Sequence, residues 1–184
     1  MSWMLLILGV LAWSGAHLFK RMAPSRRAAM GDKGKAVVAL GSLAGIVLMV
    51  IGFRATPFVN VWYPPSFMVH INNLLMLIAI YMMSPGPKKG ALFTGMRHPQ
   101  LTGFSLWAVA HLLVNGDLAA IILFGGLLVW AQSEVPAINK AEPDWTPGAK
   151  GKLVMDVAFL AASAVLLVII AFIHNWLGVG VFPV

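Results

Sequence analysis

The sequence contains no cysteine. This excludes disulfide bonds, Fe–S clusters, thiolate ligation of a metal, a cysteine nucleophile and the covalent attachment of a c-type haem. Charge is also scarce, because only 10% of the 184 residues are charged, whereas a soluble domain carries about 25%. With 60% hydrophobic residues, the chain is predicted to be an all-α bundle of helices in a lipid bilayer, where backbone groups must be satisfied internally.

Carboxylates are the rarest charged groups. We expect all six at helix edges or in loops: Asp32, Asp117, Glu134, Glu142, Asp144 and Asp156. Two carboxylates facing each other inside the bundle are therefore not expected, which argues against glycosidase chemistry, a carboxylate di-iron site and a proton-carrying carboxylate chain. Lys152 and Asp156 are predicted to form an ion pair one helical turn apart. The usual motifs of nucleotide-binding loops, serine hydrolases and zinc proteases are absent.

Six apolar segments predict a polytopic transmembrane bundle of six spans. They cover residues 3–19, 36–53, 67–83, 100–114, 118–131 and 153–177. A full crossing needs about 20 residues, so the fourth and fifth spans are short. Asn115, Gly116 and Asp117 favour a tight turn, which predicts that these two spans form a hairpin. No repeat or linker is present, so residues 1–184 are predicted to form a single transmembrane domain.

The Lys and Arg residues predict the orientation in the membrane. Twelve of the thirteen fall in three loops, residues 20–35, 84–99 and 132–152, and only Arg54 lies on the other side. Because Lys and Arg are enriched in cytoplasmic loops, these loops are predicted to be cytoplasmic and both termini to lie on the opposite side. This topology explains the formal charge of +7, so no nucleic-acid partner is expected.

Histidines are the main candidates for chemistry inside the bilayer. His17, His70 and His111 lie within apolar spans, where ionisable residues are costly and often functional. His98 opens the fourth span. His174 lies near the end of the last span, where we expect an ordinary interfacial histidine.

The fourth span carries Gly103, Trp107 and His111 at steps of four residues, so they share one stripe of a helix. Trp13 and His17 repeat the spacing of the last two. A planar ligand such as a porphyrin needs a metal-binding imidazole, an aromatic wall and a small residue where the ring approaches the backbone. This stripe supplies all three.

A haem held in this way would be b-type, with His/His or His/Met axial ligands. Non-haem iron or zinc held by histidines is the competing cofactor chemistry. A third interpretation has no cofactor: the tryptophans and Gly103 pack the bundle, and His111 bonds a neighbouring carbonyl. The spacing leaves all three open.

Depth in the membrane limits which histidines can pair on one iron, because two axial ligands must lie at nearly the same level. With about 1.5 Å of rise per residue, His111 lies roughly 20 Å beyond His98. His70 matches the depth of His111, and His17 matches that of His98. The geometry therefore favours His70 with His111, or His17 with His98.

A close-packing motif is present in the second span, where Gly41 and Gly45 form G-x-x-x-G. Such a motif lets another helix approach closely. It predicts a helix contact, either within the bundle or with a membrane partner or a second copy of the chain.

Several segments are similar to one known family. The first is Arg97-His98-Pro99-Gln100, and the similarity continues through the central residues to nearly the whole chain. With Ala110-His111-Leu112-Leu113, Asn115-Gly116-Asp117, Leu123-Phe124-Gly125-Gly126, His17, Gly31-Asp32-Lys33-Gly34, Trp62 and Pro64-Pro65, the chain resembles the NnrU family of bacterial membrane proteins.

The resemblance implies a haem b protein of a bacterial inner membrane, with periplasmic termini. NnrU proteins are associated with denitrification and with nitric oxide or nitrite, and their relatives include plant 15-cis-ζ-carotene isomerases, which use a redox-switchable haem b. A hydrophobic polyene or nitric oxide would then be the ligand. The relatives' haem ligands match His17 and His111, and the R-H-P histidine matches His98. Because depth separates His17 from His111, this pair requires a tilted or re-entrant fourth span, or ligand exchange with iron redox state.

Other functions stay open at this point. If the chain is an enzyme, the resemblance implies a haem-dependent isomerase or redox enzyme, and a sensor would use the same open ligand position. Segments similar to Arg97-His98-Pro99 also help membrane methyltransferases bind S-adenosylmethionine. A non-catalytic partner or assembly protein of a denitrification complex is the remaining alternative. A transporter is disfavoured, because no interrupted helices repeat in two halves.

Overall fold

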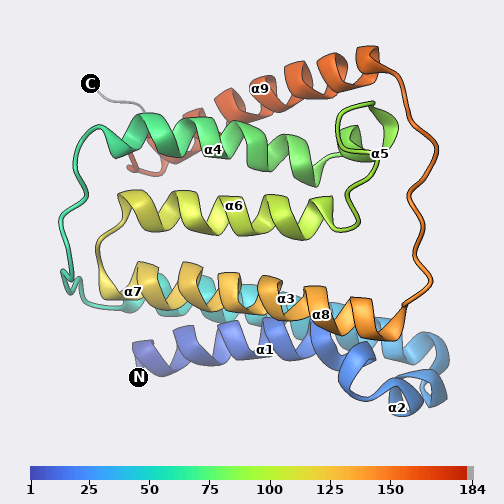
Figure 1. Cartoon of the computed structure of the whole chain (residues 1–184). Helices are drawn as coiled ribbons and strands as arrows, with labels where there is room; N and C mark the ends of the chain where they lie inside the picture. The colour runs from blue at the N-terminus through green and yellow to red at the C-terminus, as the bar shows by residue number, and fades with distance from the viewer. Residues whose placement is uncertain (182–184) are drawn as a thin grey trace. The chain divides into compact units, whose positions relative to one another are not determined.

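The computed structural model describes residues 1–181 and is built from helices (Figure 1). In chain order they are α1 (Ser2–Met22), α2 (Pro24–Ala29), α3 (Gly31–Ala55), α4 (Met68–Met83), α5 (Gly86–Lys89), α6 (Pro99–Val114), α7 (Leu118–Ala120), the π-helix η1 (Ile121–Gly125), α8 (Gly126–Ala141) and α9 (Leu153–Trp176). The predicted all-α class is confirmed. Each of the six apolar segments corresponds to one helix, with α7, η1 and α8 together forming the fifth.

Within residues 1–181, four helices are long and apolar enough to cross a membrane: α1, α3, the continuous run Leu118–Ala141 and α9. The chain is therefore a multi-pass membrane protein, with α4 as a shorter apolar helix. The fourth predicted span is short as expected, because α6 has 16 residues.

The prediction that the fifth span is short and ends at residue 131 is wrong, because this helix runs for 24 residues to Ala141. Its last turns contain polar residues, which suggested a loop by composition. One of them, Ser133, donates its hydroxyl hydrogen bond to Val129 O on the same helix, at 2.7 Å. A polar side chain satisfied in this way does not interrupt a helix. The loop predicted over residues 132–152 therefore begins only after Ala141.

The chain divides into two compact units. Unit 1 contains Met1–Tyr63 and Asn115–Glu142, and unit 2 contains Pro64–Val114 and the chain from Pro143 onward. The prediction of a single domain over residues 1–184 stays a prediction. Each unit has its own packing and is described by itself.

In unit 1, α1 packs along α3 and also contacts α8 (Figure 1). A Cβ atom added to Gly45 would lie 2.8 Å from Trp13 N, and one added to Gly9 would lie 2.6 Å from Met49 N. At Gly41 it would lie 3.2 Å from the Cβ of Ala16. The G-x-x-x-G motif is thus confirmed as a close-packing surface. Its partner is α1 of the same chain, so this motif does not supply the contact with another subunit.

The turn before α7 is held by the segment that follows α3. Val61 N donates to Gly116 O at 2.8 Å, and Leu118 N donates to Val59 O at 2.9 Å. Asp117 caps α7 by accepting a hydrogen bond from Ala120 N at 2.9 Å. The predicted turn at residues 115–117 is confirmed. The hairpin of the fourth and fifth spans joins the two units and stays a prediction.

In unit 2, α4 packs against α6 and α9, and α5 contacts α9 (Figure 1). Asn72 of α4 is buried, and its side-chain amide reaches α6. With the amide nitrogen turned toward α6, it donates a hydrogen bond to Ala110 O at 3.0 Å. In this orientation the side-chain oxygen of Asn72 accepts from Asn73 N at 3.3 Å. Interhelical hydrogen bonds of this kind join helices inside a bilayer.

Basic residues collect at one end of each unit. In unit 1, the ends of α1 and α8 meet at this basic end, where Arg21 and Glu142 form a 2.8 Å salt bridge. In unit 2, α5 and the start of α9 meet there, and α5 carries Lys88 and Lys89. In unit 1, α1 and α8 end at the basic end and α3 begins there; in unit 2, α4 ends there and α6 and α9 begin there, as the distribution of Lys and Arg predicts.

Candidate functional site

His17 lies half-buried in unit 1 between two tryptophans. Its ring centroid is 4.1 Å from that of Trp13, with an interplanar angle of 33°, and 4.9 Å from that of Trp130, at 65°. The Nδ1 atom of His17 lies 2.8 Å from Trp13 O. The predicted pairing of Trp13 with His17 is confirmed as a ring contact. Trp130 was not predicted, because it comes from a helix more than 100 residues away in the chain.

His111 has the same local arrangement in unit 2. Its Nδ1 atom lies 3.0 Å from Trp107 O, and the two ring centroids are 4.8 Å apart at an angle of 58°. Phe104 extends the aromatic wall, with its ring 5.0 Å from that of Trp107. The aromatic–histidine spacing of four residues therefore produces the predicted contact in both helices.

The hydrogen bonds to the backbone fix the tautomer of both imidazoles. A carbonyl oxygen can only accept, so Nδ1 of His17 and of His111 must donate, and in the neutral ring Nε2 carries the lone pair. Histidines that bind metals are commonly oriented in this way, with the other ring nitrogen donating to a carbonyl. Both histidines thus have the donor set that an axial ligand needs. The same hydrogen bonds would also satisfy the imidazoles in a bundle that holds no cofactor.

The histidine pairs predicted from depth differ in where their members lie. His70 is exposed in the first turn of α4, at the same end of unit 2 as His111, and the pairing of these two histidines stays a prediction. His98 lies at the other end of α6, where its carbonyl accepts from Thr102 N at 3.0 Å and from Thr102 Oγ1 at 2.9 Å. His17 with His111, and His17 with His98, each take one histidine from each unit and stay predictions.

A metal ion held by several side chains is the alternative to haem at this site. Over residues 1–181, no group of three or more His, Cys, Asp or Glu side chains is placed to hold a metal ion. This finding concerns the zinc and non-haem iron alternatives. A haem needs no more than two protein ligands, so it does not bear on haem.

His174 has a place in unit 2 that its sequence position did not indicate. It bonds Ile170 O through Nδ1 at 2.8 Å, like the two histidines above. It also lies near enough to His111 for the two imidazoles to interact electrostatically. The ordinary interfacial histidine expected at this end of the last span stays a prediction.

Gly103 contacts α4 rather than open space. A Cβ atom at this position would lie 2.7 Å from Ala79 O and 2.8 Å from the Cβ of Met82. Helix packing therefore accounts for this glycine. Its predicted role beside a planar ligand stays a prediction.

Two carboxylates have surroundings that the sequence did not predict. Glu134 is buried within α8, with 5% of its surface exposed, instead of lying in a loop. Asp156 is 3% exposed and accepts hydrogen bonds from Tyr81 Oη at 2.5 Å and from Ala91 N at 2.6 Å. The predicted ion pair of Asp156 with Lys152 is therefore wrong, because a partner from another helix replaces the neighbour on the same helix.

Asp156 fastens the basic loop after α4 to the start of α9. Gly90 lies directly against this carboxylate, with no room for a side chain. The loop before α9 is joined to the same place, since Gly151 N donates to Gly90 O at 3.1 Å. The basic end of unit 2 is thus built around one buried carboxylate.

Comparison with known proteins agrees with the family resemblance. The model of the family described as NnrU protein matches residues 5–181, which is nearly the whole chain. No curated protein and no solved structure matches it. With its membrane-spanning helices and this match along almost its entire length, the chain belongs to the NnrU family.

Proposed function

We propose that this protein binds haem b in a bacterial inner membrane and serves nitrogen-oxide metabolism, the process with which NnrU proteins are associated. One observation carries the proposal. Two intramembrane histidines, His17 and His111, each lie against a tryptophan and each have Nδ1 bonded to a carbonyl. In a neutral imidazole oriented in this way, Nε2 is the atom that would coordinate a metal.

His111 is the first proposed ligand, because it belongs to the pair implied by the family and to one of the two pairs favoured by depth. The second ligand is His17 in the first case and His70 in the second. When bound, the haem would supply a redox-active iron with an exchangeable ligand. The position of that ligand suits nitric oxide in a sensor, or a hydrophobic polyene in an isomerase. The protein's part is to orient the imidazoles and to exclude water from them.

The proposed orientation follows from the basic end of each unit. Lys and Arg collect there, and positive loops face the cytoplasm. Both termini are then periplasmic. The basic segments at residues 20–35 and 84–99, and the loop that follows α8, are cytoplasmic.

The methyltransferase alternative receives less support from the structure. The guanidinium of Arg97 lies 5.7 Å from the ring centroid of Trp145. The carbonyl of His98 accepts a hydrogen bond from Thr102 Oγ1 in the first turn of α6. Asp156, a carboxylate at this end of unit 2, is buried and bonded to Tyr81 and Ala91. It is therefore not presented to the amine of a methionine ligand.

Replacing His111 with alanine is expected to abolish haem retention in protein purified from haem-supplemented cells, because both proposed pairs lose a ligand. The measurement is haem per polypeptide by the pyridine haemochrome assay. Ser105→Ala is the matched control, since Ser105 lies on the same helix and donates its hydroxyl hydrogen bond to Leu101 O, one turn earlier on α6. Full haem content in His111→Ala contradicts the proposed site.

The second ligand can be assigned in the same assay. Loss of haem in His17→Ala but not in His70→Ala selects the pair implied by the family, and the reverse selects His70 with His111. A wild-type protein without haem overturns the proposal and favours a non-catalytic membrane partner of a denitrification complex.

A further inference from the structure

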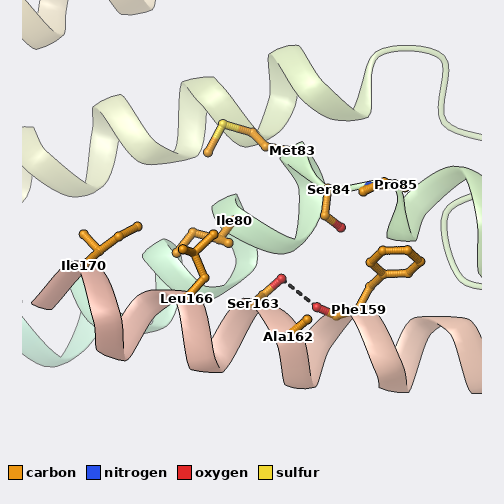
Figure 2. Close-up of a pocket in the computed structure, with 9 residues that line it drawn as sticks. All are labelled: Ile80, Met83, Ser84, Pro85, Phe159, Ala162, Ser163, Leu166 and Ile170. Atoms are coloured by element: carbon orange, nitrogen blue, oxygen red, sulfur yellow. Dashed lines mark hydrogen bonds between the residues drawn. The ribbon is translucent and has the colours of Figure 1, made fainter.

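A groove of about 400 Å³ lies within unit 2 between α4 and α9 (Figure 2). Pro85, Ser84 and Phe159 lie at one end of it, and Ile170 lies at the other. This volume falls within the range of about 300–1,000 Å³ that is usual for small-molecule sites. The groove has no part in the proposed histidine site.

The lining of the groove favours an apolar ligand. Its two hydroxyl groups are already satisfied by the helices that carry them: Ser163 donates to Phe159 O and Ser84 donates to Tyr81 O, each at 2.7 Å. Ile80, Met83 and Leu166 supply much of the remaining lining. A chain of methylene groups meets these requirements, because it needs no hydrogen-bond partner.

The length of the groove matches one leaflet of a bilayer. From Phe159 to Ile170, α9 advances eleven residues, or about 16 Å at 1.5 Å per residue. Half of the hydrocarbon core is about 15 Å thick. The groove therefore extends from the basic end of unit 2 to about the middle of the membrane.

Positive charge lies at the outer end of the groove. The Nζ atom of Lys89 is 6.0 Å from the ring centroid of Phe159, and Lys88 beside it is also exposed. Within residues 1–181, the salt bridges involve other residues than these two lysines. The Asp156 carboxylate, one turn earlier on α9, is bonded to Tyr81 and Ala91. The lysines can therefore meet an external anion.

We propose that this groove binds one acyl chain of an anionic glycerophospholipid, with the lipid phosphate at Lys88 and Lys89. The apolar wall, the length of one leaflet and the cationic end each match one part of such a lipid. The inference is independent of haem and rests on the geometry of unit 2 alone.

Lipid selectivity at the groove can be measured by fluorescence quenching, because a chain without cysteine accepts a single labelled cysteine. Ala162→Cys places the label in the groove, and Val50→Cys, at a 52% exposed position of α3, reports ordinary lipid contact. The full chain is reconstituted in vesicles of phosphatidylcholine and phosphatidylglycerol, with brominated acyl chains on one lipid or the other. Leu166→Cys serves as a second groove reporter.

The groove label is expected to be quenched preferentially by brominated phosphatidylglycerol, and the Val50 label equally by both lipids. Each lysine near an anionic lipid contributes roughly a fivefold preference. Lys89→Gln should thus lower the preference about fivefold, and Lys88→Gln with Lys89→Gln should remove it. Lys33→Gln is the control, because this exposed lysine lies on α3 in unit 1 and not beside the groove.

Three results would overturn the proposal. The first is equal quenching of the groove label by both lipids. The second is a preference that survives in the double lysine variant. The third is a groove label that neither lipid quenches while the Val50 label responds, which shows that something other than a phospholipid fills the groove.

Discussion

Asp156→Ala is expected to lower the melting temperature of the detergent-purified protein strongly, and to expose the loop between α4 and α6 to protease. Two hydrogen bonds to the carboxylate are lost at once, from Tyr81 Oη and from Ala91 N. Both donors lie near Asp156 at a site where only 3% of that residue is exposed, so water cannot easily replace it. Removing one partner of a buried hydrogen bond leaves the other unsatisfied, which is the costly case.

A series of variants separates this effect from a general loss of charge. Tyr81→Phe removes one of the two bonds and should give a smaller loss than Asp156→Ala. Asp144→Ala, in the exposed loop after α8, should leave the melting temperature unchanged. If Asp156→Ala melted like the wild type, the carboxylate would not hold the basic end of unit 2 together.

Gly45→Leu is the second substitution with a large expected effect. A side chain at this position would meet the backbone of α1, since even a Cβ atom would lie 2.8 Å from Trp13 N and 3.0 Å from Gly9 O. Backbone atoms cannot move aside as a flexible side chain can. Overpacking of a close contact costs about 1–3 kcal/mol, and backbone clashes lie at the upper end of that range or above it. We expect α1 and α3 to separate and the protein to unfold at lower temperature.

Gly15→Leu is the matched control for this substitution. Gly15 also lies on a membrane-spanning helix of unit 1, but a Cβ atom there meets nothing within 4 Å. Both variants add the same side chain and the same helix propensity. Equal thermal stability of Gly45→Leu and Gly15→Leu would contradict the close packing of α1 on α3.

Local patterns in the sequence were sufficient for the helices and for part of the site. Apolar segments predict spans because lipid satisfies no backbone group. The turn at Asn115–Asp117 follows from residues that favour turns. The contacts of Trp13 with His17 and of Trp107 with His111 follow from a spacing of four residues on one helix.

Features that depend on a second helix were missed. Asp156 was assigned to its neighbour Lys152, although Tyr81 and Ala91 reach it from elsewhere in the chain. Trp130 beside His17 and His174 near His111 are likewise supplied by distant segments. These contacts join residues that are far apart in the chain, so no local spacing in a single sequence predicts them.

The end of the fifth span shows a limit of composition. Glu134 and its polar neighbours indicated a loop, yet the helix continues past them and buries this carboxylate. Helices in membrane proteins can extend beyond the apolar segment, so hydropathy marks the segment in lipid better than it marks the end of the helix. The basic loop is shorter than predicted for this reason.

The absorption spectrum of the purified wild-type protein tests the central claim most directly. It should be recorded oxidised, reduced with dithionite, and reduced under nitric oxide, after expression with haem supplementation. A haem held by His111 and an exchangeable second histidine predicts a Soret band that sharpens on reduction and shifts with nitric oxide. A spectrum with no Soret band under all three conditions would contradict the assignment of His111 as a haem ligand.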